Sequence, residues 1–187
     1  FSDFFKKNIK VLDCTFNING SLKKRLDELR LEAEAAVREG GKHLILTDKK
    51  INEKKCSIPM ALTIGAINSR LVDLGIRGFT SINVETSEVL DTHSFAVLLG
   101  VGATTINPYI ACDSIYQRYE KKLFGKFNFE ECIQRYIKSV DNGLLKIMSK
   151  MGISVLSAYR GGCNFEALGL SRSVVAEYFP GMVSRIS

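Results

Sequence analysis

The sequence lacks the features of a membrane protein and of a secreted protein. Its longest apolar runs, at residues 58–67 and 95–103, hold about ten residues each, whereas a membrane-spanning helix needs about 20. The chain does not open on a basic segment followed by an apolar run and a small-residue cleavage site, so we expect no signal peptide. We therefore predict a protein that has no membrane partner.

Cysteine and histidine are too few and too scattered for a metal centre. The chain holds 5 cysteines and 2 histidines, and no two cysteines form a Cys-x-x-Cys pair. This pattern argues against a disulfide framework, a zinc ribbon and an iron–sulfur cradle. We expect no metal ligands, a cytoplasmic location, and reduced thiols that serve as small buried residues. The cysteines are Cys14, Cys56, Cys112, Cys132 and Cys163.

Positive charge is in excess but is not concentrated. With 26 Lys and Arg against 20 Asp and Glu, the net charge is +6, which makes a nucleic-acid-binding domain one hypothesis. However, the basic residues fall in two separate segments, 1–60 and 113–187, where acids are mixed with them. We predict a solvated surface and no nucleic-acid partner; strongly salt-dependent binding of random DNA would contradict this.

Apolar periodicity predicts alternating strands and helices in residues 1–112. Strands are expected at 9–16, 44–47, 80–85 and 104–108, helices at 22–37, 59–74 and 92–99, and a charged surface loop at 49–57. This order indicates parallel strands with right-handed crossovers. Four such units resemble half of a (β/α)8 barrel or a small doubly wound sheet, and apolar periodicity does not distinguish between these two folds. We predict an α/β fold of this kind.

Residues 113–187 are expected to form a mainly helical part of the same single domain, 1–187. Asn128 and Glu131 predict a capping box at the start of a long helix. That helix should stop at Gly152 with a positive φ. The chain is then irregular, with a short turn near 165–168, until Ser171 or Ser173 caps a last helix that ends at 180–181.

Polar residues stand at or just after the carboxyl ends of the predicted strands. Ligands of parallel α/β sheets bind at this edge. Carboxylates, hydroxyls and an amide gathered there suit hydrogen bonding to a small polar molecule. The alternative is that these groups cap the following helices and tie down loops. The residues, here called the strand-end ring, are Asp13, Thr15, Thr47, Asp48, Glu85, Asn107 and Tyr109.

A second candidate site is basic and lies toward the C-terminal end. Two glycines follow Arg160, so its planar guanidinium suits an anion held close to the backbone. Lys146 and Lys150 are four residues apart, on one side of the preceding helix. We expect these three residues to hold an anion or to dock against another domain. An ion pair between Arg160 and Glu166 is the alternative. His93 is expected to cap or pack at a helix start.

Several long motifs resemble one enzyme family. Residues 143–154 read GLLKIMSKMGIS, and residues 157–170 read SAYRGGCNFEALGL. Further matches are GVGATTINPYIA at 100–111, IPMAL at 58–62, DCTF at 13–16 and LTDK at 46–49. Together these segments cover nearly the whole chain. It resembles the central domain of the glutamate synthase large (alpha) subunit, which lies between the glutaminase domain and the FMN-binding synthase domain.

The resemblance implies a part in making L-glutamate from L-glutamine and 2-oxoglutarate. It places FMN and an iron–sulfur cluster in the parent enzyme but outside this chain, and it implies ferredoxin or a reductase subunit as partner. Ammonia must pass from the glutaminase domain to the synthase domain, so the strand-end ring is a candidate lining of that channel. The chain would act as a scaffold with no catalytic residue of its own. Its start at Phe1 agrees with an excised segment.

The sequence departs from the family pattern at several positions. Cys163 stands where the family has Gln, Lys49 where it has Arg, and Ser87 where it has Gly. Lys keeps the charge of Arg but loses its bidentate geometry, so these changes bear on how domains couple. The rival hypothesis is an independent half-barrel module that binds a phosphorylated ligand or a flavin through Arg160 and the strand-end ring.

Overall fold

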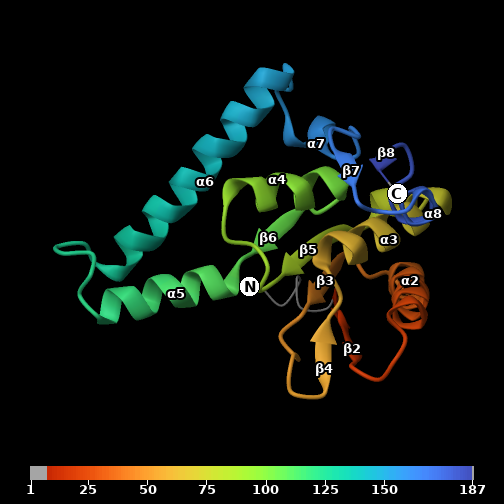
Figure 1. The fold of residues 1–187 in the computed structure, drawn as a ribbon, viewed down its shortest axis with the longest axis horizontal. Helices are drawn as coiled ribbons and strands as arrows, with labels where there is room; N and C mark the ends of the chain where they lie inside the picture. Colours follow the sequence, from red (N-terminus) through yellow and green to blue (C-terminus); the bar gives the residue numbers. More distant parts are fainter. Residues whose placement is uncertain (1–7, 187) are drawn as a thin grey trace.

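A computed structural model describes residues 8–186 and contains the predicted parallel sheet. The sheet has four strands in the order β1 (Ile9–Asp13), β3 (His43–Thr47), β5 (Ser81–Glu85) and β6 (Thr105–Asn107). All three neighbouring pairs are parallel (Figure 1). The spatial order follows the chain order, as in half of a (β/α)8 barrel. The predicted α/β class is confirmed.

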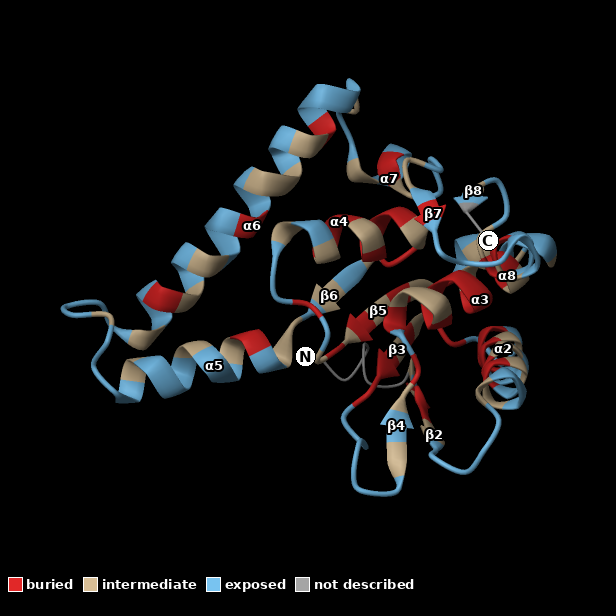
Figure 2. Ribbon diagram, in the orientation of Figure 1, coloured by how far each residue is buried: buried red, intermediate tan, exposed pale blue. Residues whose placement is uncertain are grey.

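Three helices connect these strands and cover one face of the sheet. They are α2 (Leu22–Arg38), α3 (Met60–Asp73) and α4 (Thr92–Val101). The side chains of Leu44 and Leu46 on β3 point to the same face, because side chains alternate along a strand, and both are completely buried. They share one apolar core with buried residues of all three helices. Figure 2 shows this burial concentrated in β3, β5, α3 and α4.

The helix starts follow from local capping. Ser21 accepts a hydrogen bond from the backbone N–H of Lys24 at the start of α2, and Asp91 accepts one from Ser94 at the start of α4. Pro59 precedes α3, where its missing N–H leaves no helical bond unmade. Because these signals are local, the sequence places all three starts correctly.

The first strand is shorter than predicted. The expected strand at 9–16 breaks at Cys14, and β2 (Thr15–Asn17) pairs antiparallel with β4 (Lys55–Ser57), inside the segment expected to be a loop. The carboxylate of Asp13 accepts bonds from both the backbone N–H and the hydroxyl of Thr15, at 3.2 and 2.7 Å. Such a local turn redirects the chain out of the parallel sheet. The prediction of one continuous strand was therefore wrong.

A helical arm follows β6. It consists of α5 (Tyr109–Glu120) and α6 (Phe129–Met151), which contact each other, and α6 also packs on α4 (Figure 1). The predicted capping box of Asn128 and Glu131 is confirmed, as is the positive φ of Gly152, at 69°. Because α5 begins at Tyr109, the division expected at 112–113 falls inside a helix.

The C-terminal part contains a small sheet that the sequence did not predict. After α7 (Leu156–Tyr159), strand β7 (Glu166–Leu168) pairs in parallel with β8 (Val183–Ile186), on either side of α8 (Arg172–Tyr178). The short turn expected near 165–168 is therefore a strand. Ser171 caps α8, as one of the two predicted candidates. A short 3-10 helix, η1 (Arg77–Phe79), precedes β5.

Candidate functional site

Four members of the strand-end ring form one row across the sheet. The backbone register pairs Asp13 with Thr47, Thr47 with Glu85, and Glu85 with Asn107. Each of these residues is the last of its strand. The parallel sheet thus brings four separated positions to a single carboxyl edge.

Asp48 is the buried centre of this edge. It is completely buried, and its carboxylate accepts four hydrogen bonds. Oδ2 receives the hydroxyl of Thr86 at 3.0 Å and both the backbone N–H and the hydroxyl of Ser87 at 2.8 and 2.9 Å. Oδ1 receives the hydroxyl of Tyr109 at 2.8 Å. Desolvation and the bond to Asp48 raise the pKa of Tyr109 to about 12, so Tyr109 stays a neutral donor.

Lysines neutralise the more accessible acids of the row. Nζ of Lys50 and Nζ of Lys55 lie 3.5 and 3.6 Å from Oδ2 of Asp13. Partial burial favours a higher pKa for Asp13, but the hydrogen bonds from Thr15 and these two positive charges outweigh it, and the net shift is downward. Lys49 pairs with Glu85 at 3.2 Å and lies over the ring of Tyr109, 5.3 Å from its centroid.

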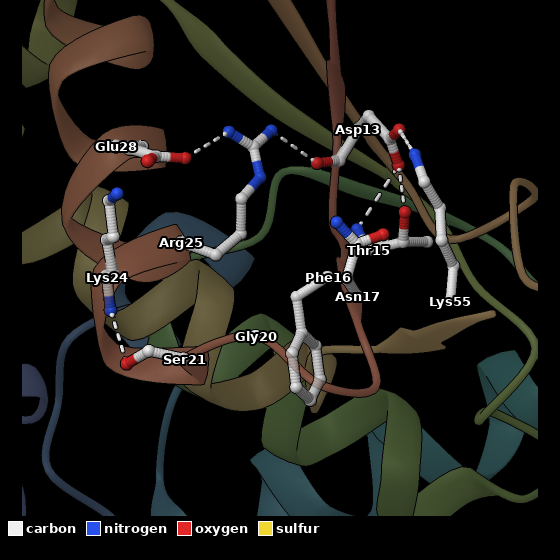
Figure 3. Close-up of a pocket in the computed structure, with 10 residues that line it drawn as sticks. All are labelled: Asp13, Thr15, Phe16, Asn17, Gly20, Ser21, Lys24, Arg25, Glu28 and Lys55. Carbon is white, nitrogen blue, oxygen red and sulfur yellow. Dashed lines mark hydrogen bonds and ion pairs between the residues drawn. The ribbon is translucent and has the colours of Figure 1, made fainter.

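A cavity of about 350 Å³ opens beside the Asp13 end of the row (Figure 3). Arg25 crosses it to donate to the backbone carbonyl of Asp13 at 2.8 Å, and it also pairs with Glu28 and Glu32 at 3.3 and 2.6 Å. Lys55 closes the other side through its ion pair with Asp13. The lining is therefore polar, and most of its charges are already paired. It suits a small hydrogen-bonding molecule better than a second large charge.

Sequence reasoning missed three residues of this edge. Thr86 and Ser87 supply three of the four bonds to Asp48, and Glu88 accepts the backbone N–H of Met60 at 3.0 Å, at the start of α3. Desolvation of its carboxylate raises the pKa of Glu88, and the charge of Asp48 adds to this shift. The sequence did contain a signal for these residues, because the three polar residues follow directly after Glu85, at the carboxyl end of a predicted strand.

The basic candidates do not join the row. Lys146 and Lys150 are exposed on α6. Gly161, next to Arg160, donates its backbone N–H to the carbonyl of Gly100 at 2.8 Å, near the amino ends of β5 and β6. Arg160 therefore lies at the opposite end of the sheet from the strand-end ring. The ion pair between Arg160 and Glu166 is not formed, since Glu166 pairs with Arg185 at 2.9 Å.

The two histidines also lie outside the row. Asp91, not His93, caps α4. The ring of His93 instead meets the edge of Phe165, with 6.4 Å between centroids, so the expected packing role holds. His43 bonds to Ser81 at the amino end of the sheet, 2.8 Å away.

Within residues 8–186, no three His, Cys, Asp or Glu side chains are grouped so that they could hold a metal ion. In that same part of the chain, no helix has the length and apolar character needed to cross a membrane.

Comparisons with known proteins agree with the motifs. The family described as Glutamate synthase central domain matches residues 3–171. The chain is 51% identical to the Glutamate synthase (NADPH) large chain of Azospirillum brasilense over 188 residues, which cover 99% of this chain and 12% of that protein. It is 41% identical to the corresponding large chain of Bacillus subtilis, over 88% of this chain and 11% of that protein. A chloroplastic ferredoxin-dependent glutamate synthase of Spinacia oleracea is 40% identical over 93% of this chain, and again 11% of its length is covered. The chain therefore belongs to the glutamate synthase central domain family.

Proposed function

We propose that this chain is the central part of a glutamate synthase large chain, which converts L-glutamine and 2-oxoglutarate to L-glutamate. The relatives that support this proposal are glutamate synthases, and the chain spans only 11–12% of their length. In this role it is a scaffold that borders the ammonia route and holds no complete active site. Its neighbours are the glutaminase and synthase domains of the same polypeptide.

The row of oxygen acceptors at a single edge of the sheet is the observation that supports this proposal most directly. Neutral ammonia donates hydrogen bonds, and carboxylate, hydroxyl and amide oxygens accept them. Asp13, Thr47, Glu85 and Asn107 present such oxygens side by side. Thr15 borders the cavity next to Asp13. We assign these residues to one wall of the ammonia route.

Asp48 and Tyr109 have a different part in the same proposal. Asp48 is completely buried, and its four hydrogen bonds are internal, so it cannot meet ammonia directly. It is a positioning residue, because its bonds fix the ends of β3 and β5 and the start of α5. These three segments carry Thr47, Glu85 and Tyr109.

The cofactors of the reaction are assigned to other parts of the polypeptide. An iron–sulfur cluster is held by several cysteine thiolates. Cys14 and Cys132 are buried in this chain, and all five cysteines are free. We propose that the cluster and FMN bind outside this segment, that ferredoxin or a reductase subunit supplies electrons, and that the location is cytoplasmic, in keeping with free thiols.

Coupling between glutamine hydrolysis and glutamate formation tests the ammonia route in the whole large chain. Asn107→Leu removes one acceptor from the wall, and Asn107 is exposed, so the fold should persist. We expect more free ammonia per glutamine hydrolysed and less glutamate formed. Gln117→Leu makes the same amide-to-apolar change on exposed α5 and should leave the ratio unchanged. An unchanged ratio in both Asn107→Leu and Thr47→Val would refute the route.

The scaffold role has its own test. The purified 187-residue chain should lack flavin absorbance after incubation with FMN and should neither hydrolyse glutamine nor form glutamate. Stoichiometric flavin binding or measurable turnover would favour the rival hypothesis of an independent ligand-binding module.

A further inference from the structure

Arg77 and the segment that carries Arg160 both bond to the C-terminal end of α4, at the opposite end of the sheet from the strand-end ring. Arg77 donates from Nη2 to the carbonyl of Gly102, the C-cap residue of α4, at 2.9 Å. It also donates from Nε to Oδ1 of Asn68 at 2.7 Å and from Nη1 to the carbonyl of Thr80 at 2.6 Å. Since a guanidinium has five N–H donors, two of its donors stay available.

Arg160 is held beside the same helix end by its neighbour. The backbone N–H of Gly161 donates to the carbonyl of Gly100 at 2.8 Å, only two residues before the Gly102 carbonyl that Arg77 uses. Nε of Arg160 is buried and has no hydrogen-bond partner among the described residues. A buried donor without a partner is uncommon in folded proteins and calls for an acceptor.

The two positive charges have no acidic counterpart. Within residues 8–186, no carboxylate lies within 4.0 Å of either guanidinium. Burial lowers the pKa of Arg77, and the nearby charge of Arg160 lowers it further. The carbonyls at the end of α4 offset part of this charge, since a helix C-terminus carries about half a negative charge. A surplus of positive charge remains.

A small cavity borders the neighbours of the two arginines. The cavity holds about 70 Å³ and is lined by Asn68, the amide partner of Arg77, and by Gly161, the neighbour of Arg160, together with apolar residues such as Phe165; neither arginine lines it. Two of its lining residues, Gly100 and Gly161, are joined by the backbone hydrogen bond between the helix end and the segment that carries Arg160.

We propose that Arg77 and Arg160 form a binding site for an oxyanion, a phosphate or carboxylate group held by the free donors of both guanidinium groups. Paired guanidinium forks match the geometry of such groups and bind them through charge-assisted hydrogen bonds. The oxyanion has two potential sources: a free anion, or an acidic side chain from another part of the large polypeptide. The site is independent of the ammonia route, because it lies at the other edge of the sheet.

Modification by phenylglyoxal tests the site in the whole large chain, with inorganic phosphate as the probe. Mass spectrometry of peptides measures the modification rate of Arg77 and Arg160 separately. Arg118, exposed on α5, is the control. At a phosphate concentration ten times its dissociation constant, the rate at Arg160 should fall about tenfold, because about a tenth of the sites stay free. The rate at Arg118 should not change.

Salt separates the two sources of the oxyanion. If an acidic side chain occupies the site, Arg160 reacts slowly without phosphate, and about 1 M salt speeds the reaction because it screens the ion pair. That result supports the site with a polypeptide carboxylate, whereas phosphate protection supports a free anion. An Arg160 that is insensitive to both phosphate and salt would overturn the proposal.

Two variants test the pairing of the arginines. Arg160→Lys keeps the charge but loses the planar fork, and Arg160→Gln loses both. Protection of Arg77 by phosphate should therefore weaken in Arg160→Lys and disappear in Arg160→Gln. Equal protection of Arg77 in both variants and in the unmodified chain would show that Arg160 takes no part in binding.

Discussion

The hydroxyl of Tyr109 donates a hydrogen bond to Oδ1 of Asp48 across 2.8 Å, and this bond joins the first residue of α5 to the end of β3. Because Asp48 is completely buried, each of its acceptor sites needs an internal donor. The remaining donors come from Thr86 and Ser87 after β5. One carboxylate thus fixes two strand ends and the origin of the helical arm.

Tyr109→Phe removes this bond and leaves a buried carboxylate oxygen without its donor. We expect the free energy of unfolding of the chain to fall by about 2 kcal/mol, as for other hydrogen bonds to charged groups. Urea unfolding measures the change as a lower midpoint at constant slope. Tyr116→Phe, on the exposed side of α5, should leave the midpoint in place. Equal midpoints for the two variants would contradict a structural role for the bond.

Gly152→Ala tests the end of α6. Gly152 has φ 69°, a left-handed conformation, and an added Cβ would meet no atom within 4 Å. The cost is therefore backbone strain alone, and the free energy of unfolding should fall by about 1–2 kcal/mol. Gly78→Ala is the matched control, because its Cβ also meets nothing and no positive φ is required there. If both variants unfold at the same urea concentration, the strain argument fails.

The predictable parts of the fold are those that short sequence signals determine. Ser21, Asp91 and Asn128 each accept a hydrogen bond from the backbone three residues on, so helix starts can be read from adjacent residues. The row at the strand ends follows in the same way, because parallel strands in sequential order bring their carboxyl ends to one edge. Asp13 and Asn107 are 94 positions apart, yet their placement needed only strand boundaries.

The parts that escaped prediction depend on contacts between distant residues. The break after Asp13 is completed by antiparallel pairing of Thr15 with Ser57, 42 positions later. The pairing of β7 with β8 joins Glu166 to Val183 across a whole helix. The separation of Arg160 from the strand-end ring depends on its loop docking at the end of α4. No local pattern encodes these partners.

Acid titration tests the cap of α4. Hydrogen bonds from the backbone and hydroxyl of Ser94 lower the pKa of Asp91 below its ordinary value of 3.8, and the charge of His93 adds to this. The folded pKa is thus below the unfolded one. The stabilisation that ionised Asp91 gives to the folded chain is therefore complete above the unfolded pKa of Asp91, and it is lost as the pH falls through the folded pKa.

Asp91→Asn supplies the comparison for this titration, because Asn retains a capping oxygen but does not titrate. The difference in unfolding midpoint between the two proteins that is present at about pH 5 should shrink as the pH falls further. If the difference in unfolding midpoint stays constant down to pH 2, the ionisation of Asp91 does not contribute to the stability of the folded chain.

Gly65→Ala tests how the C-terminal part is held on the core. Gly65 lies in α3, where an added Cβ would come within 2.5 Å of the ring of Phe179 and 2.6 Å of the carbonyl oxygen of Tyr178. The ring can rotate, but the carbonyl belongs to the backbone at the end of α8, so α8 must move away. Overpacking of this kind destabilises a protein by about 1–3 kcal/mol. The higher helix propensity of Ala than of Gly offsets only about 1 kcal/mol of this cost.

We expect faster amide hydrogen exchange in α8 of Gly65→Ala, while exchange in β3 and β5 stays slow. Gly78→Ala, which meets no neighbour, should change neither region. Unchanged exchange in α8 of Gly65→Ala would mean that this close approach does not hold the C-terminal part in place.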